Sequence, residues 1–173
     1  LTGLINSSNE LKKSISLVSI SKNFNELRGI EGDMARLYFS NFNDMIIQQK
    51  QDFIFNGRSR RPPLDNVNAM LSFGYSLLAH DVEAALLSVG IDPYVGFFHT
   101  DRPGRISLAL DMMEELRSII VDRFVLTLIN LKQINAKHFV YKESTSVLLS
   151  EDGRKLYISE WQKRKRDEKR TYF

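Results

Sequence analysis

Helical periodicity is the feature that most restricts the fold of this chain. Over most of its 173 residues, apolar side chains recur at intervals of three and four, the spacing of a helix with one buried face. Glycine and proline gather in two segments, 52–63 and 91–105, which are predicted to be loops. Helices are predicted over about 4–20, 26–49, 64–89 and 107–131, with a basic helix from about 159.

Strand signals are confined to one short region near the C-terminus. Two apolar runs, 146–149 and 156–158, flank Glu151-Asp152-Gly153, a sequence typical of a tight turn. These runs predict a small β-hairpin. The expected fold class is therefore all-α, a helical bundle with one hairpin, because the helices must bury their apolar stripes against one another.

Composition excludes several classes of site. The chain has no cysteine, which rules out disulfides, thiolate metal sites and a thiol nucleophile, and is typical of a reducing compartment. No segment approaches the ~18 uninterrupted apolar residues of a membrane helix, and no signal-peptide pattern is present. We therefore expect a single soluble cytosolic domain with no membrane partner.

Positive charge is concentrated in two places. The net charge is +3, yet segment 163–170 alone carries six cations and two acids, which leaves the remainder close to neutral. A second basic cluster, Arg58, Arg60 and Arg61, precedes Pro62. Clustered cations are compatible with binding of a polyanion. Solvated helix ends and loop tips have the same composition, so charge alone leaves both interpretations open.

The second predicted helix carries a carboxylate on its apolar face. At about 100° per residue, Glu31 lies one turn from Leu27, Met34 and Ala35. A carboxylate among apolar neighbours is costly unless a cation, a metal ion or a proton compensates its charge. Glu31 is therefore either a metal ligand or half of a buried ion pair with an arginine of another helix.

The fourth predicted helix carries an acidic arc beside its apolar stripe. No lysine or arginine lies on this arc, although exposed helix faces usually mix signs because like charges repel. Glu114 is nearest the stripe, where a half-buried ligand would lie, and Arg117 offers an intrahelical ion pair as the alternative. The pattern does not choose between Glu114 and Glu115. The arc consists of Ser107, Asp111, Glu114, Glu115, Ser118 and Asp122.

One of the three histidines precedes this acidic helix. His99 lies in the loop before it and can point at Asp111 or Glu114, whereas His80 and His138 lack such a context. Two carboxylates and an imidazole suit Mg²⁺ or Mn²⁺, which keep waters and bind phosphate oxygens, better than a closed Zn²⁺ site. With the arginines at 58, 60, 61, 102 and 105, this set favours metal-assisted phosphoryl transfer on nucleic acid.

Four ordered motifs carry a family resemblance. Across about 25–122 the chain resembles the CRISPR-associated adaptation integrases, the first-numbered Cas family (Cas-one), and the region 139–159 also fits. The motifs are RGIEGDMARLYF at 28–39, RRPPLDNVNAMLSFGYSLL at 60–78, GFFH at 96–99 and DRPGRISLALDMMEELR at 101–117.

The resemblance implies a domain and a set of site residues. Family members have an N-terminal β-domain followed by an α-helical catalytic domain, and residues 1–173 correspond to the helical domain without the β-domain. The family's metal-binding glutamate, histidine and second acid fall on Glu31, His99 and Glu114. Asp111 matches a further acidic position that would support the site. The implied cofactor is Mg²⁺ or Mn²⁺.

The resemblance also implies an activity in CRISPR spacer acquisition, a prokaryotic antiviral defence of the cytoplasm. Such a metal-dependent DNA endonuclease or integrase joins a protospacer 3′-hydroxyl to a phosphodiester of the CRISPR repeat by transesterification. The implied partners are double-stranded DNA (protospacer and repeat), a second copy in a homodimer, and the second-numbered Cas protein (Cas-two). The helical domain alone is expected to join DNA weakly or not at all. The candidate phosphate contacts are Arg58, Arg60, Arg61, Arg102 and Arg105.

Two other functions remain open from the sequence. One is a helical DNA-binding or assembly module with no metal chemistry of its own. The other is a helical scaffold whose acids pair internally with Arg36, Arg117 and Arg123. Glu31 separates these functions, because an integrase needs it beside His99 and Glu114, whereas a scaffold would pair it with an arginine.

Overall fold

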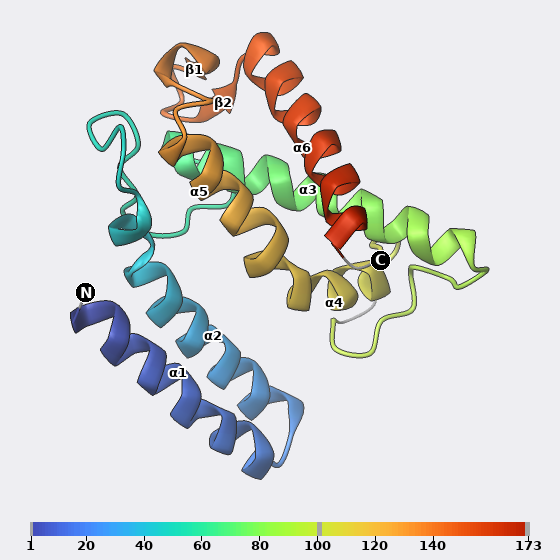
Figure 1. Cartoon of the computed structure of the whole chain (residues 1–173). Helices are drawn as coiled ribbons and strands as arrows, with labels where there is room; N and C mark the ends of the chain where they lie inside the picture. Colours follow the sequence, from blue (N-terminus) through green and yellow to red (C-terminus); the bar gives the residue numbers. More distant parts are fainter. Residues whose placement is uncertain (1, 100–101, 172–173) are drawn as a thin grey trace. The chain divides into compact units, whose positions relative to one another are not determined.

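The computed structural model describes residues 2–99 and 102–171, with the side chains of 3–99 and 102–166. It confirms the all-α class with a small hairpin near the C-terminus (Figure 1). No helix in this described part of the chain is long and apolar enough to cross a membrane. The elements are α1 (Thr2–Ile20), α2 (Phe24–Ser40), η1 (Phe42–Met45), α3 (Asn66–Ser88), α4 (Ser107–Leu116), η2 (Arg117–Asp122), α5 (Arg123–Asn130), η3 (Ala136–His138), β1 (Phe139–Tyr141), β2 (Val147–Leu149) and α6 (Glu151–Thr171).

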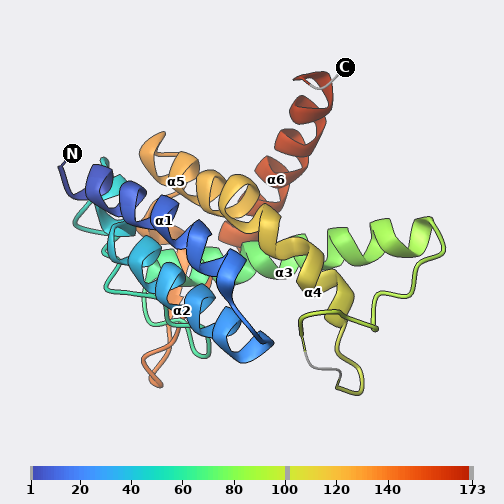
Figure 2. The same ribbon diagram turned by 90° about the horizontal axis from the view of Figure 1, so that it is seen from below.

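The chain forms two compact units. Unit 1 comprises Leu1–Ile46 and Phe55–Arg58, and unit 2 comprises Ile47–Ile54 and Ser59–Phe173. In unit 1, α1 and α2 lie side by side (Figure 1, Figure 2). The side chain of Asn23 caps α2 by accepting hydrogen bonds from the N–H groups of Asn25 and Glu26.

Helix α2 ends earlier than predicted. The helical period extends to about residue 49, but α2 stops at Ser40 and a 3₁₀ turn follows. Phe42 and Ile46 are fully buried, and Phe42 packs against Phe55 with ring centres 5.0 Å apart. Burial of these side chains on a tighter turn therefore outweighs the local preference for a continued helix.

Helix α3 organises unit 2. Asp65 caps its first turn by accepting from the N–H of Asn68, and Gly90, at φ 77°, follows its end as predicted. Helix α3 contacts α4, η2, α5 and β2. On α6, the Trp161 indole donates to Asp81 at 2.9 Å. The largest fully buried side chains of this unit are Trp161, Tyr157, Phe53, Met70, Leu71, Met113, Leu128, Ile129, Ile134 and Val67.

Both strands of the β-hairpin precede α6, whereas the prediction placed the second strand at 156–158. Strands β1 and β2 pair antiparallel, with Phe139 opposite Leu149. The predicted second strand, 156–158, lies inside α6, so that prediction was wrong. Glu151 and Asp152 form the acidic first turn of α6, which suits a helix N-terminus. Gly153 serves close packing, because a Cβ there would overlap the carbonyl oxygen of His138.

The fourth predicted helix is interrupted by a π turn. It starts at Ser107 as predicted and ends at Asn130, but η2 replaces the α-helical register over Arg117–Asp122. Helical periodicity does not indicate this turn. Its effect is to rotate every residue after Arg117 relative to the residues of α4.

Replacing Gly74 of α3 tests this packing. A Cβ at Gly74 would overlap the Tyr157 hydroxyl and lie 2.6 Å from Val121 Cγ1, so Gly74→Ala should lower the unfolding free energy. The expected loss is about 1–3 kcal/mol. Urea unfolding followed by fluorescence of Trp161, the single tryptophan of the chain, measures it. Gly32→Ala on α2 is the control, because its methyl group would meet no atom within 4 Å other than the neighbouring backbone of its own helix. An unchanged midpoint for Gly74→Ala would contradict the close packing of α3 on α6.

Candidate metal and DNA-binding site

The loop before α4 is held by one carboxylate. Asp111 is buried on α4, and its Oδ2 accepts from the N–H groups of Phe97 at 2.7 Å and Phe98 at 2.9 Å. Its Oδ1 accepts from the N–H of His99 at 2.9 Å and from His99 Nδ1 at 2.5 Å. Asp111 therefore fixes both the backbone of the loop and the orientation of the imidazole.

Glycine at position 96 permits this contact. A Cβ on Gly96 would lie 2.7 Å from Ser107 Cβ and 2.8 Å from Asp111 Oδ2. Ser107 is the first residue of α4, and Ile106 occupies the cap position and makes no side-chain hydrogen bond. Instead, the Pro93 carbonyl accepts from the N–H of Leu108 at 2.9 Å. A carbonyl group of the loop therefore satisfies a backbone N–H group at the start of α4.

Opposing effects act on the pKa of Asp111. Burial alone would raise it, because a low-dielectric environment penalises the charged form. Hydrogen bonds from the Phe98 N–H, the His99 ring and the N–H groups of Phe97 and His99 outweigh burial and lower the pKa below its ordinary value of 3.8. The ionised carboxylate accepts hydrogen bonds only, so His99 Nδ1 carries the proton. In the neutral imidazole, the lone pair is then on Nε2.

Glu114 faces this nitrogen. His99 Nε2 lies 4.0 Å from Glu114 Oε1, and both side chains are about one-quarter exposed, at 21% and 28%. The other oxygen, Oε2, accepts from Arg117 Nη1 at 2.8 Å. The structure thus contains both the histidine–carboxylate pair and the intrahelical ion pair, which the sequence offered as alternatives. Glu115, by contrast, is exposed.

Two acids of the predicted arc are not solvated. Asp111 and Asp122 are 5% and 2% exposed. The π turn carries Asp122 away from the arc, and its Oδ1 accepts from the Tyr75 hydroxyl at 2.6 Å. Tyr75 also lies under the guanidinium of Arg117, 5.2 Å from ring centre to Cζ. Tyr75 is therefore a neighbour of the site that sequence reasoning missed, because no charge or spacing signal marks it.

Glu31 belongs to unit 1, whereas His99 and Glu114 belong to unit 2. It is exposed on α2, which has no buried residue, so its predicted burial on an apolar face was wrong. The described ion pair of Arg36 is with Asp33, not with Glu31. Within neither unit do three described His, Asp or Glu side chains form a ready-made metal cluster.

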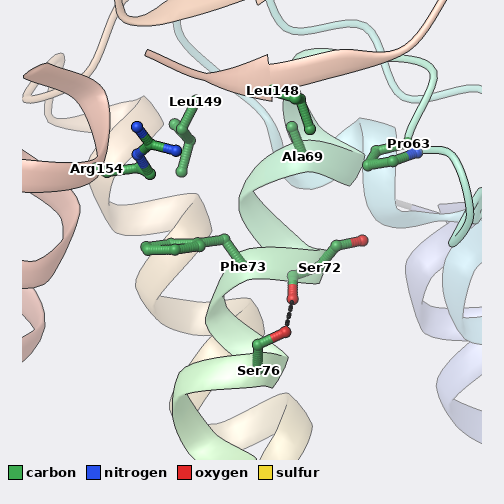
Figure 3. A pocket seen from close by; sticks show the side chains of 8 residues that line it. All are labelled: Pro63, Ala69, Ser72, Phe73, Ser76, Leu148, Leu149 and Arg154. Carbon is green, nitrogen blue, oxygen red and sulfur yellow. Dashed lines mark hydrogen bonds between the residues drawn. The ribbon is translucent and has the colours of Figure 1, made fainter. Parts of the chain in front are cut away.

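The predicted phosphate contacts lie mainly at the surface. Arg60 and Arg61 are exposed before α3, and Arg102 is exposed in the loop before α4. Arg58, in unit 1, and Arg105 are half-buried. A pocket of about 260 Å³ lies elsewhere in unit 2, and no predicted site residue lines it (Figure 3). Its lining is Pro63, Ala69, Ser72, Phe73, Ser76, Leu148, Leu149 and Arg154.

Similarity to a known protein family identifies the family of this chain. The model of the family described as CRISPR associated protein Cas1 matches residues 2–163. The chain belongs to the Cas1 family. This membership confirms the resemblance to Cas-one. A Cas1 relative from Rhodospirillum rubrum, named CRISPR-associated endonuclease Cas1 2, is 55% identical over 147 residues, which cover 85% of this chain and 43% of the relative. The chain thus spans less than half the length of that relative.

Solved structures give the same family. A casposase bound to integration product matches with a TM-score of 0.78 and 32% identity, covering 87% of this chain and 42% of the casposase. A chain of a partial Cas6-RT-Cas1–Cas2 complex matches with a TM-score of 0.82 and 31% identity, covering 92% of this Cas1 chain and 48% of that one. The fold described above is therefore shared with a little under half of each of these chains.

Substitution of Asp111 tests whether its carboxylate stabilises the loop before α4. Because its pKa is lowered by folding, the ionised carboxylate stabilises the folded chain above pH 3.8, and this contribution is lost as the pH falls through the lower folded pKa. Asp111→Asn should therefore lower the unfolding free energy by about 1–3 kcal/mol near neutral pH. The difference from wild type should shrink in acid, as measured by urea unfolding across pH.

Asp92→Asn is the matched control for this measurement. Asp92 lies in the same loop, and its Oδ1 accepts one hydrogen bond, from the Tyr94 N–H at 2.9 Å, which the asparagine oxygen can retain. We expect a small change at every pH. Equal losses for the two variants would contradict the role given to Asp111.

Proposed function

We propose that this chain is the helical catalytic region of a metal-dependent DNA integrase and endonuclease of CRISPR spacer acquisition. The observation that carries the proposal is the orientation of His99, whose Nδ1 is held by Asp111 and whose Nε2 faces Glu114. A histidine fixed by a carboxylate on one nitrogen, with the other directed at an acid, is a recurrent arrangement of metal ligands.

The donor set fits a divalent cation. Two donor atoms, each about 2.1 Å from one ion, are at most about 4.2 Å apart. The 4.0 Å gap between His99 Nε2 and Glu114 Oε1 falls within that limit and is too long for a hydrogen bond. One imidazole and carboxylate oxygens, with positions left for water and phosphate, suit Mg²⁺ or Mn²⁺. Glu31 would be the third protein ligand.

Each residue has a defined part in the proposed reaction. Asp111 holds the imidazole, and His99, Glu114 and Glu31 would bind the cation, so His99 is a ligand and not the general base. A bound Mg²⁺ or Mn²⁺ would polarise the target phosphate and stabilise the charge that develops on its oxygens. The protospacer 3′-oxygen bonds to phosphorus as the repeat strand's 3′-oxygen leaves. The attacking hydroxyl loses its proton to solvent and the leaving oxygen gains one.

The proposed partners are DNA, a second copy of the chain and Cas2. Exposed Arg60, Arg61 and Arg102, with Arg58 and Arg105, would contact phosphates, which position the DNA and make its affinity depend on salt. The likeness to a casposase solved with an integration product supports the DNA substrate. The likeness to a chain of a Cas1–Cas2 complex supports Cas2.

One observation favours a second function, a helical DNA-binding or assembly module without metal chemistry. The contact of Glu114 with Arg117 already neutralises part of the carboxylate charge that a cation would need. In such a module, His99 and Glu114 would stabilise the loop and bind no ion.

Titration with Mn²⁺ separates the two functions. The wild-type chain should bind saturably in calorimetry, and His99→Ala, Glu114→Gln and Glu31→Gln should each weaken binding roughly 10-fold or more, as loss of ligands does. Joining of a labelled DNA 3′-hydroxyl end to a repeat duplex is expected to be weak for the wild-type chain, and the same variants should abolish what joining it shows. Glu115→Gln, an exposed acid adjacent to Glu114, is the control and should bind as wild type. Equal binding in all variants, or none in any, would favour the module.

A further inference from the structure

The π turn η2 brings two residues to one tyrosine. In an α-helix, residues five apart lie about 140° apart around the axis, whereas an i→i+5 turn brings them to one side. Arg117 and Asp122, the ends of η2, are five residues apart. Both contact Tyr75 of α3: Asp122 Oδ1 accepts from its hydroxyl at 2.6 Å, and Arg117 Cζ lies 5.2 Å from its ring centre.

Arg117 connects Tyr75 to Glu114, which with His99 forms the candidate pair of metal ligands. Its Nη1 donates to Glu114 Oε2 at 2.8 Å, which leaves Oε1 directed at His99 Nε2. Its Nε is buried and has no hydrogen-bond partner among the described residues. A hydrogen bond at Nε therefore does not hold the guanidinium, which instead contacts the Glu114 carboxylate and the face of Tyr75.

We propose that Tyr75 is a positioning residue for the metal site. Asp122 orients its ring, the ring holds the Arg117 guanidinium, and Arg117 draws one oxygen of Glu114 so that the other faces His99. The proposal rests on the proposed function where it concerns metal binding. It also explains the π turn at this point of the helix, because a continuous α-helix would not present Arg117 and Asp122 to the same ring.

The arrangement has a chemical consequence for Glu114. A carboxylate free to rotate could offer both oxygens to a cation or turn to solvent, and ordering it on binding would cost side-chain entropy. Held on one oxygen by Arg117, Glu114 presents a single oxygen in a fixed direction. Loss of the Tyr75 ring should therefore weaken cation binding even though Tyr75 touches neither the cation nor DNA in this account.

Three variants and one matched control test the proposal on the full chain. Tyr75→Leu removes the ring, Tyr75→Phe keeps the ring but loses the hydroxyl, and Arg117→Lys keeps the charge but loses the planar guanidinium. Phe73→Leu is the control, since Phe73 lies on the same helix and packs on Tyr157, with ring centres 5.2 Å apart. Phe73→Leu should lower the free energy of unfolding and leave the contacts among Tyr75, Arg117 and Glu114 unchanged.

Two readouts are needed, Mn²⁺ affinity by calorimetry and the imidazole resonances of His99 without metal. We expect Tyr75→Leu and Arg117→Lys to weaken Mn²⁺ binding roughly 10-fold, as loss of an outer partner of a ligand does, and Tyr75→Phe to have a smaller effect. Both larger variants should shift the His99 resonances of the metal-free chain. Phe73→Leu should lower the urea midpoint and change neither readout.

The outcomes distinguish this proposal from the proposed function. If wild type binds no Mn²⁺, the proposed function fails, while the metal-free His99 resonances still decide whether Tyr75 positions Glu114. If Tyr75→Leu leaves the His99 resonances and any Mn²⁺ affinity as in wild type, the positioning role is overturned. It is equally overturned if Phe73→Leu changes both readouts as much as Tyr75→Leu.

Discussion

The buried carboxylate of Asp111 is the interaction on which the candidate site depends. It accepts four hydrogen bonds from a loop that would otherwise carry unsatisfied N–H groups against the start of α4. The same contact sets the tautomer of His99 and directs Nε2 at Glu114. One side chain thus fixes the loop, the imidazole and the direction of the proposed ligand, and Gly96 supplies the space in which this can occur.

The proposed Cas1 chemistry draws on different parts of the chain for different tasks. In unit 2, α4 supplies Asp111 and Glu114. Tyr75 of α3 contacts Arg117 and Asp122, the two ends of the π turn that follows α4. Unit 1 supplies Glu31 on an exposed surface of α2, where its carboxylate is accessible to solvent. Side chains of unit 2 thus contact two of the three proposed ligands, and the third belongs to the other compact unit.

Local signals predicted much of the fold and part of the candidate site. Periodicity predicted α3 over about 64–89, close to its observed bounds of Asn66–Ser88, because this signal acts within one helix. The end of α2 depends on burial of Phe42 against Phe55, and the role of Gly153 depends on its approach to His138, so neither follows from neighbours in sequence. The acidic arc indicated the helix that carries Asp111 and Glu114, which lie beside His99 in the structure. It did not show that Asp111 accepts hydrogen bonds from the loop backbone or that Asp122 accepts one from the Tyr75 hydroxyl. Both contacts join different elements of the fold.

The most direct test of the central claim, that His99, Glu114 and Glu31 bind one divalent cation, is the anomalous scattering of Mn²⁺ in crystals of this chain grown with the ion. The account predicts a peak between His99 Nε2 and Glu114 Oε1, with a Glu31 oxygen in the same coordination sphere and Asp111 still on Nδ1 of the histidine. A peak elsewhere, or none at saturating Mn²⁺ with Glu114 still on Arg117, would contradict it.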